Sequence, residues 1–187
     1  MLSKNDSFEE DFDFSENKDL WDWDWLSNNE SLPWSIELIE RFEEHWDWRD
    51  WIKLSGNEGL PWSLELIEHF EGQWDWKGLS ENKGLPWSLE LIERFEKRWH
   101  WSDLSGNECL PWSLELIERF EKRWDWEVLS KREILPWSLD LIERFAERWK
   151  WHLFPMNATL HLPTLRTADI VAIMEFNEAR AKLLKRN

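Results

Sequence analysis

Apolar and polar positions along the chain follow one pattern that returns five times. A Leu-Pro-Trp-Ser phrase is followed by an apolar residue, an acid, Leu, Ile and Glu, and then by Phe and a Trp-x-Trp pair. The steps between successive phrases are 28, 25, 25 and 25 residues, since the phrases begin at Leu32, Leu60, Leu85, Leu110 and Leu135. Self-similarity at a fixed period is typical of repeat architectures. The pattern therefore predicts a tandem array of five units.

Each unit begins with a segment of helical periodicity. In the fourth copy, every fourth position is apolar: Leu116, Phe120 and Trp124. Such spacing places side chains on one face of a helix. Ser113 precedes the run and is a suitable N-cap, because its hydroxyl can accept from backbone N–H groups of the first turn. On the opposite face, Glu115 lies four residues before Arg119, and we expect an ion pair within the helix.

A second, shorter helix is predicted after each Trp-x-Trp pair. Asp125, between the two Trp of the fourth pair, is a suitable N-cap, and the helix would run to Leu129 before a turn. A long helix and a short helix in each unit predict an all-α fold, a tandem αα-repeat solenoid. The alternative is a leucine-rich-repeat-like unit with a parallel strand. It would put the repeated Pro in that strand, where Pro cannot donate to the ladder.

The repeat boundaries divide the chain into three regions. Residues 1–31 form an acidic N-terminal segment with degenerate copies that we expect to cap the array, and residues 32–151 hold the five repeats. Residues 152–187 lack the Trp pair and predict a C-terminal capping helix, because the end of a stacked array needs a less apolar outer face. The first period is longer by three residues between Trp48 and Leu54, so we expect this connection to tolerate insertion.

The repeated phrases resemble a known class of sequences. Leu-Ser-x-Asn-x-x-Leu-Pro-Trp-Ser followed by Trp-Asp-Trp is similar to the Trp-rich repeats of about 25 residues in proteins of bacteria and large DNA viruses. The resemblance covers residues 12–151. It implies a repeat array and carries no agreed activity.

Charge limits the partners that we expect. The formal net charge is −16, and residues 1–31 hold ten acidic and two basic side chains. Phosphate backbones and anionic membrane surfaces repel such a chain, so we expect no direct nucleic-acid binding and no membrane association. The lone Cys109 allows no intrachain disulfide, and the N-terminus has no apolar segment of the signal-peptide type. These features favour the cytoplasm.

Nothing in the sequence has the pattern of an enzyme or metal site. The five histidines lie at non-equivalent positions of the repeat, without the spacing of paired metal ligands: His45, His69, His100, His152 and His161. Nucleophile motifs, phosphate-binding loops and dinucleotide fingerprints are missing as well. We therefore expect a protein that is not an enzyme and that uses no cofactor or metal.

The nineteen Trp are the most distinctive feature of the composition. For the first Trp of each pair we expect a core ladder, because a large aromatic residue buries much apolar area. The second Trp either extends that ladder or forms an exposed platform that stacks sugars, bases or cations. The second positions are therefore candidate partner-binding residues: Trp48, Trp76, Trp101, Trp126 and Trp151.

Three further candidates lie near the start of the chain. Phe8, Phe12 and Phe14 alternate with acids, which is the pattern of an acidic docking peptide. The alternative is that this segment caps the first unit.

Together these features predict a non-catalytic scaffold for protein–protein interaction whose protein partner has a basic face. One alternative is an acidic inhibitor that mimics nucleic acid to block a DNA- or RNA-binding protein. Another is a small-molecule or glycan binder that uses exposed Trp. The sequence leaves the oligomeric state and the identity of the partner open.

Overall fold

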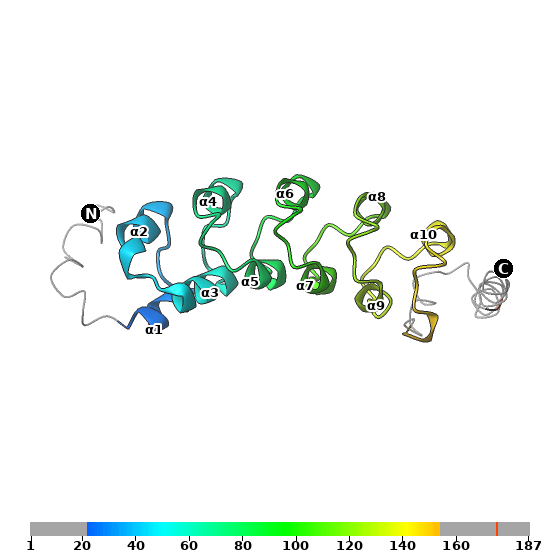
Figure 1. Ribbon diagram of the computed structural model, residues 1–187, viewed down its shortest axis with the longest axis horizontal. Helices are drawn as coiled ribbons and strands as arrows, with labels where there is room; N and C mark the ends of the chain where they lie inside the picture. Colours follow the sequence, from blue (N-terminus) through cyan, green and yellow to red (C-terminus); the bar gives the residue numbers. More distant parts are fainter. Residues whose placement is uncertain (1–21, 154–174, 176–187) are drawn as a thin grey trace, which may run out of the picture.

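The computed structural model describes residues 22–153 and residue 175, and over these residues it is helical, without strands. The helices alternate between two rows (Figure 1). One row contains α2 (Ile36–Arg41), α4 (Leu64–His69), α6 (Leu89–Arg94), α8 (Leu114–Arg119) and α10 (Leu139–Arg144). The other contains α1 (Trp23–Ser27), α3 (Trp48–Gly56), α5 (Trp76–Glu81), α7 (Trp101–Gly106) and α9 (Trp126–Leu129). The 3₁₀ helices η2 (Glu43–His45) and η3 (Trp151–Leu153) complete the described elements.

Successive helices of the second row contact one another, α1 with α3, α3 with α5, α5 with α7 and α7 with α9. Each unit is a first-row helix together with the element that follows it along the chain. Units one to four are α2 with α3, α4 with α5, α6 with α7 and α8 with α9, and α10 with η3 forms the fifth. The predicted tandem helical repeat is confirmed.

The repeated serine begins each first-row helix as expected. Ser113 Oγ accepts a hydrogen bond of 3.1 Å from the backbone N–H of Leu116, and the equivalent bond is present in all five units. The helix is shorter than its apolar stripe predicts, because α8 ends at Arg119. Turns then continue the chain, with the backbone N–H of Trp124 donating to the carbonyl of Phe120. The stripe therefore stays on one side of the unit although regular helix covers only its first part.

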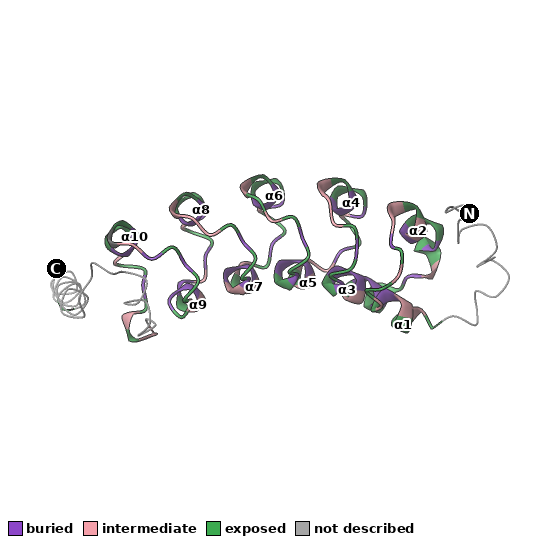
Figure 2. Ribbon diagram, turned by 180° about the vertical axis from the view of Figure 1, so that it is seen from behind, coloured by how far each residue is buried: buried purple, intermediate pink, exposed green. Residues whose placement is uncertain are grey.

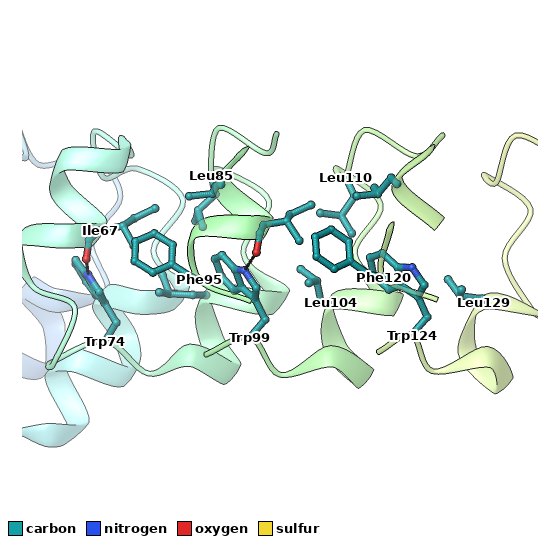
Figure 3. Packing of buried hydrophobic residues seen from close by; sticks show 14 of the residues in the cluster. Ile67, Trp74, Leu85, Phe95, Trp99, Leu104, Leu110, Phe120, Trp124 and Leu129 are labelled. Atoms are coloured by element: carbon teal, nitrogen blue, oxygen red, sulfur yellow. Dashed lines mark hydrogen bonds between the residues drawn. The ribbon is translucent and has the colours of Figure 1, made fainter. Parts of the chain in front are cut away.

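The core repeats the same side chains in each unit. Leu, Ile, Phe and the first Trp of each pair are buried, and Figure 3 shows them at equivalent places in successive units. Trp99 is 4% exposed, and its indole N–H donates to the carbonyl of Ile92 at 3.1 Å. Trp46, Trp74 and Trp124 make the same bond to Ile39, Ile67 and Ile117. The first Trp of the pairs thus forms the expected ladder, and Figure 2 shows that burial recurs in every unit.

The joints between units contain a buried ladder of asparagines, Asn57, Asn82 and Asn107. Asn82 Nδ2 donates to the carbonyls of Ser55 at 2.9 Å and Asn57 at 3.3 Å, both in the preceding unit. Its Oδ1 accepts from the N–H of Gly84, which closes a turn within its own unit. Asn107 repeats this arrangement against Ser80 and Asn82. One side chain therefore shapes a turn and fixes the spacing to the previous unit.

A buried serine forms a second inter-unit contact. Ser105 Oγ donates to the carbonyl of Trp101 and accepts from the backbone N–H of Asp125, twenty residues further along. Ser55, Ser80 and Ser130 make equivalent pairs of bonds. Hence each unit is held to the next by a hydrogen bond from a main-chain N–H group to a serine hydroxyl.

The exposed ion pairs of the first row run between units, which corrects one expectation. Arg119 contacts Glu93 of the preceding unit at 2.7 Å, and no Glu115–Arg119 pair is present in the described part of the chain. Arg94 pairs with Glu68 in the same way, and Arg144 with Glu118. Neighbouring helices lie side by side, so the carboxylate of the adjacent unit is within reach of each guanidinium. The i,i+4 arrangement persists at Asp140 and Arg144.

The three extra residues of the first period lengthen α3 to nine residues. Since a helical turn takes 3.6 residues, three more residues add almost one turn and leave the rest of the helix in phase. Consequently Trp51, rather than Trp48, occupies the position of Trp76 in the next unit. Trp51 lies 5.3 Å from Phe70 and 5.1 Å from Trp74, and Trp76 lies 5.0 Å from Phe95 and 5.1 Å from Trp99.

Candidate interaction surfaces

Four of the five candidate second-position Trp contribute to the packing of the array. Trp76, Trp101 and Trp126 each contact the Phe and the first Trp of the following unit, with ring centroids 4.8–5.1 Å apart. Trp126 is 9% exposed, and Trp76, Trp101 and Trp151 are half-buried. The indole N–H of Trp151 donates to the carbonyl of Ala146. Their rings therefore offer little free surface to a ligand.

Trp48 is placed differently, on the turn that the insertion adds to α3. Its side chain is 71% exposed. Ile52, four residues later and 45% exposed, lies on the same face of the helix. Trp25 on α1 and Ile134 are the other large apolar residues with such exposure among the described residues.

Ile52 is as unusual as Trp48. It lies two residues before the Leu-Ser step, where α1, α5, α7 and α9 carry only polar residues: Asp24, Lys77, Ser102 and Glu127. The one described helix with an inserted turn, α3, thus carries two exposed apolar residues, Trp48 and Ile52.

Charges beside this face are partly neutralised by pairing. The carboxylate of Asp47 accepts from the backbone N–H groups of Arg49 and Asp50 and contacts the Arg49 guanidinium at 3.0 Å. The hydrogen bond from Arg49 lowers the pKa of Asp47, and the same contact raises the pKa of Arg49. Lys53 is paired with Asp24 of α1. Both bases near Trp48 and Ile52 thus already have acidic partners.

The net negative charge is concentrated in the first half of the array, because that half has few bases. Residues 22–81 hold 15 acidic and 4 basic side chains, whereas residues 82–153 hold 14 acidic and 12 basic ones. Later units gain bases on the turn after the first helix, where Arg98, Arg123 and Arg148 pair with Glu71, Glu96 and Glu121 at 2.9–3.0 Å.

At the first joint that pattern is broken. Gln73 takes the place of these arginines in the second unit, opposite the position of Glu43 in the first. In the described part of the chain, Glu43 and its neighbour Glu44 form no ion pair, and both are exposed. The replacement of Arg by Gln73 is present in the sequence. Its meaning becomes clear only when the units are aligned and the ion pairs between units are known.

Other candidate positions contribute less. Phe8, Phe12 and Phe14 lie outside the described residues. The best-formed hollows on the described surface are open, and one of them is lined by Leu64, Glu65, Glu68 and His69. Groups of three or more His, Cys, Asp or Glu side chains suited to a metal ion are not found within residues 22–153.

In the part of the chain that the structure describes, no helix has the length and apolar character to cross a bilayer. No family model, curated protein or solved structure matches the chain.

Proposed function

We propose that this chain is a non-catalytic, cytoplasmic scaffold for protein–protein interaction, and that its acidic first half receives the basic face of a partner protein. The observation that carries the proposal is the uneven charge of the array, with 15 acids against 4 bases in residues 22–81. A surface of one sign attracts and orients a partner of the opposite sign and raises the rate of association.

The carboxylates of this half also recur in a regular line. Glu37 on α2 and Glu65 on α4 occupy the second position of successive helices and are exposed. Because successive units present these carboxylates at equivalent positions, an extended partner surface with regularly spaced bases would meet one carboxylate per unit. Units three to five keep an acid at this position, but there Arg94, Arg119 and Arg144 also pair with glutamates of the preceding unit along the row. For this reason we favour a local basic partner over an inhibitor that mimics nucleic acid along the whole array.

Matched charge reversals test the proposal. The full chain and two double variants, Glu37→Lys with Glu65→Lys and Glu90→Lys with Glu115→Lys, would be used to capture proteins from the native host. The two variants change net charge equally and at the same helical positions. We expect a captured basic protein to lose about tenfold or more of its association rate with the first variant and little with the second. Equal loss with both variants, or a captured nucleic acid instead of a protein, would contradict it.

A further inference from the structure

The inserted turn of α3 separates two kinds of Trp in this chain. Trp23, Trp51, Trp76, Trp101 and Trp126 all contact the Phe and first Trp of the following unit. Trp51 already supplies this contact for the first unit, so packing of the array does not require Trp48. Removing residues 48–50 would leave Trp46-Asp47 followed directly by Trp51, which restores the Trp-Asp-Trp phrase and the 25-residue period. The insertion also brings the buried Asp50 to Ser27, whose Oγ donates to its carboxylate at 3.5 Å. Without the insertion, Asp47 would precede the packed Trp as Asp75 does in the next unit, where its backbone N–H donates to Ser55.

Two independent features mark this surface. Trp48 is exposed because the insertion places it one turn before the joint, and Ile52 is exposed because an apolar residue stands where the other second-row helices have polar ones. At i,i+4 spacing the two side chains form one apolar ridge on α3. Trp, with Tyr and Arg, is enriched among the residues that dominate the binding energy at protein interfaces.

We propose that the Trp48–Ile52 ridge is the anchor point for an amphipathic basic helix of the partner protein. This inference rests on the proposed function and assigns it a site and a partner chemistry. The ridge supplies the apolar contact. The carboxylates of Glu43 and Glu44, which form no ion pair with the described residues and lie on the 3₁₀ helix that leads into α3, receive the partner's Lys or Arg.

Charge decides among the possible occupants. A second copy of the chain that docked through the same surface would bring its own 15 acids against 4 bases of residues 22–81, and an anionic membrane surface would be repelled for the same reason. A neutral apolar segment would leave the nearby carboxylates without partners. A helix with apolar residues on one side and bases on its flanks satisfies both the ridge and the acids, because its apolar side can pack on Trp48 and Ile52 as one helix packs on another.

The ridge is too small to be a complete interface, so it serves as an anchor within a larger contact. One Trp buries on the order of 200 Å², whereas a stable interface buries about 1,200–2,000 Å² in total. The acidic surface of the first two units provides the remaining area. Loss of the ridge should therefore weaken binding strongly while leaving a residual, salt-sensitive attraction.

The experiment uses a fluorescent synthetic peptide of about 18 residues, made of Leu, Ala and Lys with the Leu on one helical face. A scrambled peptide of the same composition is the control. Binding to the full chain would be measured by fluorescence anisotropy, alongside a variant lacking residues 48–50. We expect the deletion to weaken binding of the amphipathic peptide by about tenfold or more and to leave binding of the scrambled peptide unchanged. The shortened chain should still melt cooperatively, because the backbone N–H of Asp47 can then donate to Ser27 as that of Asp75 does to Ser55.

A gain-of-function variant makes the test independent of unfolding. In the deleted chain, Trp-Arg-Asp would be inserted after Asp75 and combined with Lys77→Ile, which rebuilds the ridge on α5. We expect binding to return to within about threefold of the original, because the same two side chains are presented from an adjacent acidic unit.

The outcomes separate the inference from the proposed function. If the deletion binds the peptide as the full chain does, while Glu37→Lys with Glu65→Lys weakens it, the ridge is not the anchor and the acidic scaffold stands. If neither change weakens binding, or if the full chain does not bind the peptide at all, both are overturned. Dimerisation of the full chain that the deletion abolishes would assign the ridge to a second copy and overturn the inference alone.

Discussion

Asn82 shows how much a single buried side chain does in this array. Its amide nitrogen donates to two carbonyls of the preceding unit, its amide oxygen closes a turn, and its own backbone carbonyl accepts from the indole of Trp87 and from Asn107 of the next unit. Buried polar groups that lose such partners carry the full cost of desolvation. Asn82 therefore links three consecutive units.

We expect Asn82→Ala to lower the free energy of unfolding by about 3 kcal/mol, because the carbonyl of Ser55 and the N–H of Gly84 lose this partner, and an unsatisfied group costs about 1–3 kcal/mol. The carbonyl of Asn57 keeps its bond from the indole of Trp62. Chemical denaturation would measure the loss of stability. Lys83→Ala, at the exposed neighbouring residue, is the control and should change stability by less than about 0.5 kcal/mol. A small loss for Asn82→Ala would show that the ladder does not hold the units together.

The sequence predicted the turn at these asparagines but not the ladder. Asn followed by Gly two residues later, as in Asn82 and Gly84, is a local signal that a turn explains completely. The partners of Asn82 Nδ2 lie 25 and 27 residues away, so they become visible only when the stacking is known. The Glu–Arg pairs were misassigned for the same reason: at i,i+4 spacing a partner within the helix was available, and the geometry of the stack supplied a nearer one.

At the scale of the helix, N-capping explains the regularity of the second row and one exception to it. Asp125 accepts from the N–H groups of Glu127 and Val128 at the start of α9, and Asp75 accepts from Gly78 at the start of α5. Burial opposes the charge of Asp125, but the hydrogen bonds from Val128, Ser102 and Glu127 prevail and lower its pKa. His100 begins α7 with a similar backbone conformation but without a side-chain cap.

Replacing this residue should therefore stabilise the protein. His100→Asn places an amide oxygen where Asp75 and Asp125 have a carboxylate oxygen, and a good cap contributes about 0.5–2 kcal/mol. We expect a gain of about 0.5–1 kcal/mol, since the exposed contact of His100 with Asp103 is lost. Thermal unfolding at pH 8 would detect it, and Asp75→Ala should shift the melting temperature in the opposite direction. A melting temperature for His100→Asn at or below that of the unchanged chain would contradict the capping argument.

The capping signals also show what local sequence predicts well. Ser113 and its equivalents were expected to begin helices and do so in every unit, because a cap acts within three residues. Trp48 was grouped with Trp76 because both follow a Trp-Asp step. Whether Trp48 or Trp51 is the equivalent of Trp76 depends on which of the two contacts the next unit. The sequence does not show this, because three extra residues could lengthen either a helix or a loop.

Over the whole molecule, contacts between units link each one to its immediate neighbours. The stability of such an array is approximately a sum of unit and interface terms. Deleting residues 85–109 joins Gly84 to Leu110 and reproduces the native phase of the repeat. We expect the shortened chain to remain folded, with a lower melting temperature, because one unit and one joint are lost while Ser80 finds the backbone N–H of residue 125 in place of residue 100.

Circular dichroism and small-angle scattering would test this against a deletion of twelve residues at the same place, which breaks the phase. The in-phase deletion should keep its helicity per residue and shorten the particle, and the out-of-phase deletion should lose structure. Equal unfolding of both would show that the array is stabilised by long-range contacts that the joints do not explain.

The joints have a consequence for how the gene can change. Asn107 and Ser105 bind carbonyl and N–H groups of adjoining units, which every residue type except proline provides in full. A unit therefore accepts as its neighbour any other unit that keeps the buried Phe and Trp rings of the joint, whatever side chains the latter exposes. Recombination between misaligned copies of the repeat, which adds or removes whole multiples of 75 base pairs from the 25-residue periods, would yield proteins whose new joints are already compatible. Length and surface can thus vary over generations while the architecture stays the same.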